Sequence, residues 1–478
     1  MQMNPARLHA RVLAGDPADN GRFFFGVTTT GIYCLPSCKA RKPRLENTRY
    51  FPTAEAARAA GLRPCKKCHP DDFARGADPV LESIEQLVAE IRIQPAAFRD
   101  ARAVVRRSGF GPTRLFELFR QHHHATPADL LLRARLRRAR EQLLATDTPL
   151  ADLAHDAGFQ SLSVFHEHFR AANGLTPLAC RELRDASAFE ITLPAGYPLA
   201  HLKRSLGRDP ESLTERLDGD TCTAAVRLGP RQTPALIRLR LAPGRIHVST
   251  TRPHAPEAHA VVVGLLGLDQ DAAGFARLAR KLGLARLVDG REKLRIVQTP
   301  SVFDGLLWAI IGQQINLPFA FRLRQRLTKL VSPPLADGLF APPSPAAVAA
   351  LSPEDLRPLQ FSRAKTTTLI DTARLVAGGE LDLDALRAMS ATRAERTLLA
   401  LRGFGPWSVN YVMMRSLGLA DCLPLGDTGV TSGLKRLFDL DERPDREATL
   451  RLMAVFAPHR SLATAHLWQL NQPAPEAS

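Results

Sequence analysis

"GIYCLPSCKARKP", residues 31–43, and "RPCKKCHP", residues 63–70, together hold four of the chain's seven cysteines. Three residues separate the first pair and two separate the second, with a 26-residue gap between the pairs. Paired cysteines in a reducing compartment are more often metal ligands than disulfides, and two such knuckles supply the four sulfur atoms of a tetrahedral zinc site. The sequence therefore predicts a small domain built around Zn²⁺, with the ligands Cys34, Cys38, Cys65 and Cys68.

A zinc ion with four cysteine ligands has no open coordination position. Such a site is either purely structural or reactive through one of its own sulfur atoms. Zn²⁺ keeps its sulfur ligands as thiolates at neutral pH, and a thiolate is a nucleophile. The spacing alone favours the structural alternative and leaves the reactive one open.

Length and composition indicate the number of domains and the class of partner. The 478 residues suggest three or four domains, and the 45% of hydrophobic residues are enough for buried cores. Lys and Arg exceed Asp and Glu by 64 to 48, a net charge of +16, which favours a polyanionic partner, first of all nucleic acid. The sequence shows neither an apolar run of membrane-spanning length nor an apolar signal segment at its start. We expect a cytoplasmic protein without a membrane partner.

The cysteine motifs lie within a longer stretch, residues 23–72, which includes "TTGIYC", "ENTRYF" and "AAGLRPCK". Over its whole length this stretch resembles the N-terminal domain of the Ada family of alkylation-response proteins. The resemblance implies that a zinc-bound thiolate takes the methyl group from a methyl phosphotriester in DNA and is consumed. The acceptor would be Cys34, while Lys39 and Arg41 would hold neighbouring phosphates.

Two helical blocks follow, at residues 98–144 and 149–183. Each has a helix, a turn with glycine, a second helix ending in Phe-Arg and a Thr-Pro restart, which is typical of helix-turn-helix motifs. The pair resembles the DNA-binding domain of AraC-type regulators, most clearly in "GFQSLSVFHEHFRAANGLTP". The second helices, 112–121 and 161–169, are predicted to enter the major groove, with Arg114 and Ser163 as DNA-binding candidates.

The first of these blocks departs from the AraC-type pattern at two places. Gly111 replaces the usual hydroxylated cap, and three consecutive histidines occupy residues 122–124. Three consecutive positions on a helix point in different directions, so we interpret the histidines as surface residues rather than metal ligands.

The two N-terminal parts together predict a switch. A zinc ion with four thiolates carries a formal charge of −2, and methylation of one ligand leaves −1, so repulsion from phosphate falls and DNA binding tightens. The resemblance implies a transcription activator that works with RNA polymerase.

The C-terminal half has another character. Alternating apolar residues with Pro and Gly breaks at 191–250 predict a small antiparallel sheet. Further on, "LRGFGPWSVNYVMM", residues 401–414, has a glycine turn between helices, where the amides near Gly403 and Gly405 would bind DNA phosphate. With "IGQQIN" before it and "LPLGDTG" after it, the half resembles the AlkA-type 3-methyladenine DNA glycosylases.

This second resemblance assigns roles to individual residues. Asp427 would be the catalytic aspartate, although Asp421 is a rival acid and Asp427 could instead be a helix N-cap. Gln314 would fill the hole left by the flipped base, and the aromatic pocket would comprise Trp407, Tyr411 and Trp468. Electron-rich aromatic faces suit a methylated, cationic base that has left the stack. Relatives that nick DNA have a lysine where this chain has Trp407, which predicts a monofunctional glycosylase.

The expected fold is multidomain and mainly α, with α+β parts. We expect an Ada-type zinc domain at 1–77, a double helix-turn-helix at 78–186, a TBP-like sheet subdomain at 187–298 and a helix-hairpin-helix glycosylase core at 299–472. The protein is expected to act as a monomer on double-stranded DNA. Two alternatives remain open: a transcription regulator whose glycosylase-like part is an inactive sensor, and an oxidised-base glycosylase with nicking activity, which the missing lysine disfavours.

Overall fold

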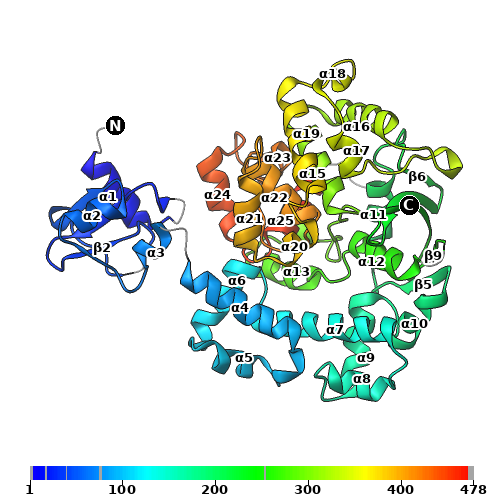
Figure 1. Cartoon of the computed structure of the whole chain (residues 1–478), viewed down its shortest axis with the longest axis horizontal. Coiled ribbons are helices and arrows are strands. Elements are labelled where there is room, and N and C mark those ends of the chain that lie inside the picture. The colour runs from blue at the N-terminus through cyan, green and yellow to red at the C-terminus, as the bar shows by residue number, and fades with distance from the viewer. Residues whose placement is uncertain (1–3, 17–18, 39, 75–77, 252–253, 472–478) are drawn as a thin grey trace. The chain divides into compact units, whose positions relative to one another are not determined.

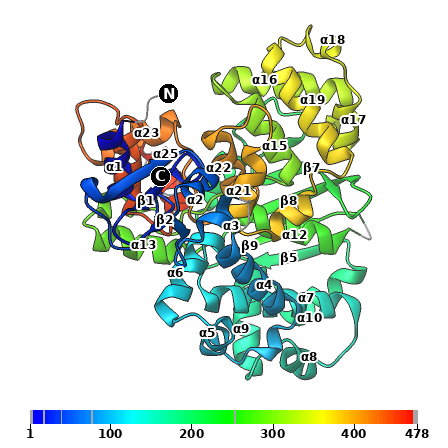
Figure 2. The same cartoon turned by 60° about the vertical axis from the view of Figure 1, so that its left-hand side comes forward.

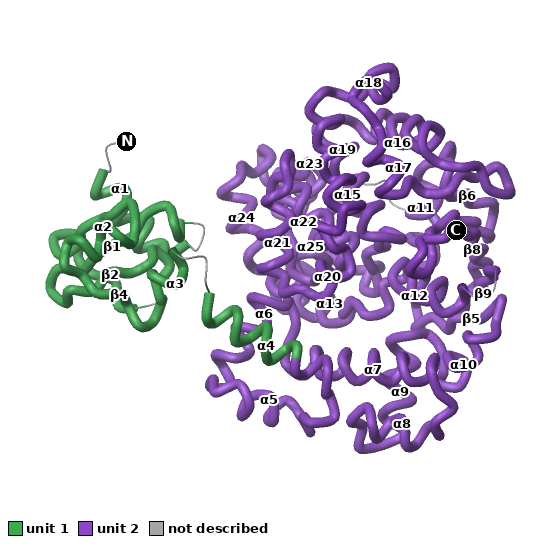
Figure 3. The backbone as a smooth tube through the Cα atoms, viewed as in Figure 1, with its two compact units in different colours: residues 1–89 green, residues 90–478 purple. Residues whose placement is uncertain are grey.

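The computed structural model describes residues 4–16, 19–38, 40–74, 78–251 and 254–471. The chain divides into two compact units, residues 1–89 and 90–478 (Figure 3). Within the described ranges, none of the helices has both the length and the apolar character needed to cross a membrane.

The first unit is a four-stranded sheet with short helices around it. The strand order is β3-β1-β2-β4, with β4 parallel to β2 and the other pairs antiparallel. This order places the end of β2 beside the residues that follow β4, where the amide of Cys65 donates to the carbonyl oxygen of Tyr33 at 3.0 Å. The two cysteine motifs are thereby brought together. The elements are α1 (Pro5–Ala14), β1 (Phe24–Val27), β2 (Ile32–Cys34), η2 (Leu45–Asn47), β3 (Thr48–Phe51), α2 (Ala54–Ala59), β4 (Arg63–Pro64) and α3 (Pro70–Ala74).

The second unit begins with two helix-turn-helix motifs joined by the long helix α7. Glycines in the left-handed conformation, Gly109 and Gly158, lie in the two turns, as the sequence pattern predicts. At Gly158 an added Cβ would lie 2.9 Å from the Cα of Ala96, so a side chain would not fit there. The helices of this region are α4 (Pro79–Ile93, which spans the division between the units), η3 (Pro95–Ala97), α5 (Ala101–Ser108), α6 (Pro112–His123), α7 (Pro127–Ala145), α8 (Leu150–Asp156), α9 (Leu162–Asn173), α10 (Pro177–Glu182) and η4 (Leu183–Asp185).

A five-stranded antiparallel sheet of order β5-β9-β8-β7-β6 comes next, in agreement with the predicted sheet (Figure 2). Along β8 the buried residues Ile237, Leu239 and Leu241 alternate with exposed arginines, so one face is buried, and α12 packs on this core. The elements are β5 (Ala188–Thr192), α11 (Leu199–Leu206), β6 (Glu215–Asp218), β7 (Thr221–Leu228), β8 (Thr233–Ala242), β9 (Arg245–Ser249) and α12 (Ala255–Leu266).

The remainder is a helical core (Figure 1) built around the apolar helices α15 and α22. Its elements are α13 (Ala272–Lys281), α14 (Ala285–Val288), α15 (Val302–Ile311), α16 (Leu317–Val331), η5 (Ala336–Gly338), α17 (Pro345–Ala349), α18 (Pro353–Leu356), α19 (Arg363–Ala377), α20 (Leu383–Ala388), α21 (Ala391–Leu399), α22 (Pro406–Arg415), α23 (Thr428–Leu437), α24 (Arg446–Ala454) and α25 (Arg460–Leu470).

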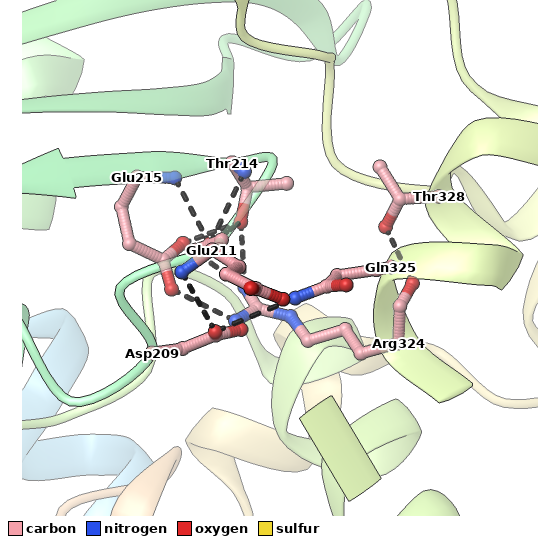
Figure 4. A network of polar contacts seen from close by, with 8 residues as sticks. Asp209, Glu211, Thr214, Glu215, Arg324, Gln325 and Thr328 are labelled. Atoms are coloured by element: carbon pink, nitrogen blue, oxygen red, sulfur yellow. Dashed lines mark hydrogen bonds and ion pairs between the residues drawn. The ribbon is translucent and has the colours of Figure 1, made fainter. Parts of the chain in front are cut away.

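A polar network fastens the sheet to this helical core (Figure 4). Arg324 of α16 donates to both carboxylate oxygens of Glu215 at 2.8 and 3.1 Å and to the hydroxyl of Thr214 at 2.7 Å. An arginine that forms two hydrogen bonds to one carboxylate fixes orientation as well as distance, so the start of β6 is held in a fixed position against α16.

The three histidines at the end of α6 are not surface residues, and that expectation was wrong. His122 and His123 are buried, and the Nδ1 atom of His122 lies 2.9 Å from the hydroxyl of Thr392 in α21. The Nδ1 atom of His124 accepts from the amide of Asp421 at 3.2 Å, and burial lowers the pKa of His124 to about 4. Sequence periodicity within α6 could not indicate the burial of these histidines, because the segments that cover them come from much later in the sequence.

The second helix-turn-helix also packs against a distant part of the chain. The Nε2 atom of His259, on α12, lies 2.8 Å from the carbonyl oxygen of Asn173, the last residue of α9. His259 is fully buried, so its ring forms part of the joint between this motif and the sheet. Both DNA-binding motifs are therefore packed onto the C-terminal half.

Candidate functional site

The four cysteines of the first unit converge on one point. Their sulfur atoms all lie within 4.8 Å of one another, and those of Cys38 and Cys65 are 4.0 Å apart. A zinc tetrahedron with metal–sulfur bonds of about 2.3 Å has edges of roughly 3.8 Å, which this cluster matches. Two backbone amides, those of Leu35 and Lys67, point at sulfur atoms at 3.4 Å. Such donors stabilise thiolates, so the residues fit a zinc ion.

The cysteines differ in exposure and in acidity. Cys34 is 4% exposed, whereas Cys68 is partly exposed. Hydrogen bonding to Cys38 raises the pKa of Cys34, and hydrogen bonding from Cys34 lowers the pKa of Cys38. A thiolate at Cys34 requires a cation, which Zn²⁺ supplies when bound.

The DNA-binding candidates of the N-terminal half lie on accessible surfaces. Arg41 is exposed, while Lys39 lies outside the described residues. Arg114 is exposed on α6 and forms an ion pair of 3.2 Å with Glu117, and Ser163 is exposed in the first turn of α9. Arg41 belongs to the first unit, whereas Arg114 and Ser163 lie on two different helices of the second unit.

The two helices predicted to enter the major groove, α6 and α9, begin differently. The hydroxyl of Ser161 caps α9 by accepting from the amide of Val164 at 3.4 Å, whereas Gly111 gives α6 no side-chain cap. The predicted absence of a hydroxylated cap on α6 is thus confirmed, and its first-turn amides lack the partner that α9 has.

Asp427 lies at the centre of the C-terminal candidates. One carboxylate oxygen accepts from the indole nitrogen of Trp407 at 3.0 Å, and the other accepts from that of Trp468 at 2.9 Å. The second oxygen also accepts from the amide of Val430 at 2.9 Å, so Asp427 is the N-cap of α23 as well. The cap and the indole contacts coexist, and three donors fix the orientation of the carboxylate.

Aromatic rings surround this carboxylate. Trp407 and Tyr411, one turn apart on α22, stack with their ring centroids 5.4 Å apart and their planes 23° apart. Gly429 leaves room for Trp468, because a Cβ there would lie 2.7 Å from the indole ring. Any side chain at Gly429 would push Trp468 away from Asp427. The structure therefore brings together four of the predicted site residues, which are Trp407, Tyr411, Asp427 and Trp468.

The rival acid Asp421 is engaged elsewhere. Its two carboxylate oxygens accept from Nε and Nη2 of Arg460 at 2.7 and 2.8 Å, and this pair fixes the start of α25. Sequence reasoning missed Arg208, in the segment between α11 and β6. Burial lowers the pKa of Arg208, while the charges of Tyr411 and Asp427 oppose that shift.

Two accessible loops adjoin the aromatic cluster. The turn between α21 and α22 contains Gly403, exposed with φ of 78°, and Gly405, which starts α22 without a side-chain cap. Uncapped amides at a helix N-terminus suit a phosphate group. The turn between α15 and α16 presents Gln314, exposed with φ of 54°. These are the positions predicted for phosphate binding and for filling the gap left by a flipped base.

The fold and its sites define a class of protein: a DNA-repair protein with a zinc-thiolate domain, two helix-turn-helix motifs and a helix-hairpin-helix core. Family comparisons agree in chain order. Residues 7–71 match the metal binding domain of Ada, residues 104–183 match a helix-turn-helix domain, and residues 307–459 match the HhH-GPD superfamily of base excision DNA repair proteins.

Relatives match both parts of the chain and the whole. A DNA-3-methyladenine glycosylase of Bacillus subtilis is 31% identical over 42% of this chain and 68% of its own, and the chain belongs to that family. A probable bifunctional transcriptional activator/DNA repair enzyme AlkA of Mycobacterium tuberculosis is 29% identical over 97% of this chain and 95% of its own. The 3-methyladenine DNA glycosylase of Archaeoglobus fulgidus shares the fold, with a TM-score of 0.52, 21% identity and coverage of 59% of this chain and 98% of that one.

Proposed function

We propose that this protein repairs alkylated DNA by two reactions and activates transcription in response to the first. Methyl transfer would reside in residues 1–77, promoter binding in 78–186 and base excision in 187–472, the sheet subdomain (187–298) and the hairpin core (299–472) acting together. The main support for the excision function is the Asp427 carboxylate held by the indoles of Trp407 and Trp468 at 3.0 and 2.9 Å.

In the first reaction the thiolate of Cys34 attacks the methyl carbon of a DNA methylphosphotriester. A sulfur–carbon bond forms while the carbon–oxygen bond breaks, and the phosphodiester leaves with the electron pair as an anion. The other three cysteines remain zinc ligands. A thioether does not return its methyl group, so each protein molecule reacts once. Arg41 and Lys39 would hold neighbouring phosphates during the approach.

In the second reaction a methylated base turns out of the duplex and lies against Trp407, whose face attracts its positive charge and is backed by the stacked ring of the buried Tyr411. The bond from the sugar to the base nitrogen breaks, and the base leaves neutral with the electron pair. Asp427 stabilises the positive sugar and orients a water molecule that adds to it. Lysine is replaced by Trp407 at the position after the hairpin, so no imine forms and the strand stays intact.

The regulatory part of the proposal concerns promoter DNA and RNA polymerase. Methylation at Cys34 removes one negative charge from the zinc site, which strengthens binding through α6 and α9. A monomer has two helix-turn-helix motifs of its own and needs no partner copy to present both, which supports action as a monomer.

One experiment tests both reactions. Duplex DNA carrying radioactive methyl groups is incubated with the protein, and released bases, protein-bound methyl and strand breaks are measured in the same samples. We expect release of methylated purines with turnover, at most one methyl per protein and no breaks before alkali. Methyl uptake without base release would favour a regulator with an inactive sensor, and a borohydride-trapped protein–DNA adduct would contradict the monofunctional assignment.

A further inference from the structure

Gln314 has a backbone conformation that its surroundings must hold. Its φ of 54° lies in the left-handed region, which costs a residue other than glycine on the order of 1 kcal/mol. The side chain is nevertheless exposed, so its own packing does not supply the restraint. The restraint must come from the neighbouring residues of the turn.

Three side chains hold that turn through four hydrogen bonds. The buried amine of Lys365, on α19, donates to the carbonyl oxygen of Ile311 at 2.6 Å, where α15 ends. Asn316 caps α16 by accepting from the amide of Phe319 at 3.0 Å. Between these two ends, the side-chain amide of Gln313 donates to the carbonyl oxygen of Gly403 at 3.0 Å and to the hydroxyl of Ser408 at 2.9 Å.

The contacts of Gln313 reach the phosphate-binding hairpin. Gly403 lies in the hairpin turn, and Ser408 is buried in the first turn of α22. The other side of Gly403 faces α19, because an added Cβ would lie 2.4 Å from the hydroxyl of Thr368. Thr368 is one helical turn beyond Lys365, so the same helix supports the hairpin turn and the Gln314 turn.

From this arrangement we propose that Gln313 is a positioning residue that joins the hairpin to Gln314. When the hairpin binds the phosphate backbone, Gln313 thereby fixes the position at which Gln314 enters the duplex. The inference rests on the proposed excision function and on the role of Gln314 there. It assigns Gln313 a part in extruding the base, beyond folding or general DNA affinity.

Gln313→Met tests the inference, since methionine keeps the length of the side chain and removes both donors. Because each hydrogen bond contributes about a factor of five, we expect single-turnover excision to fall at least about tenfold. The fluorescence change of 2-aminopurine placed beside the methylated base, recorded in an Asp427→Asn background to prevent excision, should shrink in parallel. Affinity for undamaged duplex should stay near wild type, and the thermal midpoint should fall by only a few degrees, because two hydrogen bonds of the folded state are lost.

Gln232→Met is the matched control. Gln232 also has a left-handed backbone, with φ of 51°, and its amide also donates to a glycine carbonyl, that of Gly229 at 3.1 Å, but it lies in the turn between β7 and β8. Its replacement should leave excision and fluorescence unchanged. Ser408→Ala removes one of the two acceptors and should give a smaller loss that does not add to that of Gln313→Met.

Three outcomes overturn the inference: wild-type excision by Gln313→Met, an equal loss of affinity for undamaged duplex, or full additivity with Ser408→Ala. If Gln313→Met is too unstable to assay, Ser408→Ala alone decides by the same fluorescence measurement. Gln314→Ala distinguishes failure of the proposed role of Gln314 from failure of the inference about Gln313. If that change leaves the fluorescence intact, the proposed role of Gln314 fails, whereas a loss with Gln314→Ala but none with Gln313→Met refutes only the inference about Gln313.

Discussion

The two proposed reaction centres hold their candidate reactive groups in opposite ways. The cysteine cluster is formed from residues close in sequence, and its acceptor candidate Cys34 is 4% exposed. Asp427 is partly exposed and contacts the indoles of Trp407, on α22, and Trp468, on α25. These two tryptophans are 61 residues apart in the sequence. The first centre suits a reaction that happens once, and the second suits one that repeats.

This difference follows from what each reaction leaves behind. In the proposed first reaction the methyl group stays on sulfur in the first unit, so only the repaired DNA strand has to leave that centre. The proposed second centre must admit a large base and release it, and the carboxylate of Asp427 and the indoles of Trp407 and Trp468 are accordingly only partly buried. Because the centres lie in separate compact units, a change in one should leave the other intact.

The largest effect is expected from Cys34→Ser. A serine hydroxyl is neither a strong zinc ligand nor a thiolate, so methyl uptake should be abolished, whereas base excision should stay near wild type. Protein-bound radioactive methyl and released bases are counted in one reaction, and zinc content is measured by mass spectrometry.

Peptide mapping of the methylated wild-type protein provides the control. The added methyl should lie on the Cys34 peptide. Cys68 is the more exposed thiol, so a methyl group on its peptide would show that exposure, rather than position in the motif, selects the acceptor.

Asp427→Asn should have the next largest effect. Asparagine keeps the size and the capping oxygen but loses the charge opposite the developing positive sugar, so single-turnover excision should fall by about 10²–10³-fold. Methyl uptake should not change. The rate is measured on duplex DNA with one methylated purine.

Asp445→Asn is the matched control for this change. Asp445 also caps a helix, α24, by accepting from the amide of Ala448 at 2.8 Å, and it is exposed. A comparable loss of excision in Asp445→Asn would trace the effect of Asp427→Asn to lost capping, and near-normal excision by Asp427→Asn would remove this carboxylate from the mechanism.

The sequence was sufficient for features that depend on local pattern. The cysteine spacing predicted the cluster, glycine turns predicted both helix-turn-helix motifs, and strand alternation predicted the sheet. Contacts between distant segments could not be read in this way. The burial of His122 against Thr392, the capping of α23 by the same carboxylate that holds two indoles, and the link from Gln313 to Gly403 all depend on tertiary packing.

Acid should act on the second unit through its buried histidines. The Nε2 nitrogen of His259 donates to Asn173, and its Nδ1 atom is buried with no hydrogen-bond partner in the described structure, so burial lowers the pKa of His259 to about 4. The unfolded chain, with a histidine pKa near 6.5, then binds more protons between about pH 6.5 and 4. Stability is full above this window and is lost as pH falls through it.

His259→Gln should reduce that acid sensitivity, because glutamine can donate to Asn173 but does not titrate in the window. One histidine contributes a slope of up to about 1.4 kcal/mol per pH unit, and the other buried histidines keep theirs. Urea unfolding of the full chain at several pH values measures the slope. An unchanged slope would mean that His259 is already accessible to protons in the folded state.

The smallest effect is expected from methylation itself, which tests whether the first centre signals to the DNA-binding motifs. Loss of one negative charge near the phosphate backbone is worth a few tenths of a kcal/mol to about 1 kcal/mol, or roughly a two- to fivefold gain in affinity. Since this gain is electrostatic, it should be greatest at low salt and fade as the Debye length shortens.

Titration of labelled promoter DNA with methylated and unmethylated protein, at matched salt concentrations from low to high, measures this gain in affinity. Cys34→Ser exposed to the same methylated DNA controls for damage to other residues. Equal affinities at every salt concentration would show that methylation of Cys34 does not tighten DNA binding through charge. Methyl removal and regulation would then be separate properties, and any switch would have to depend on a structural change.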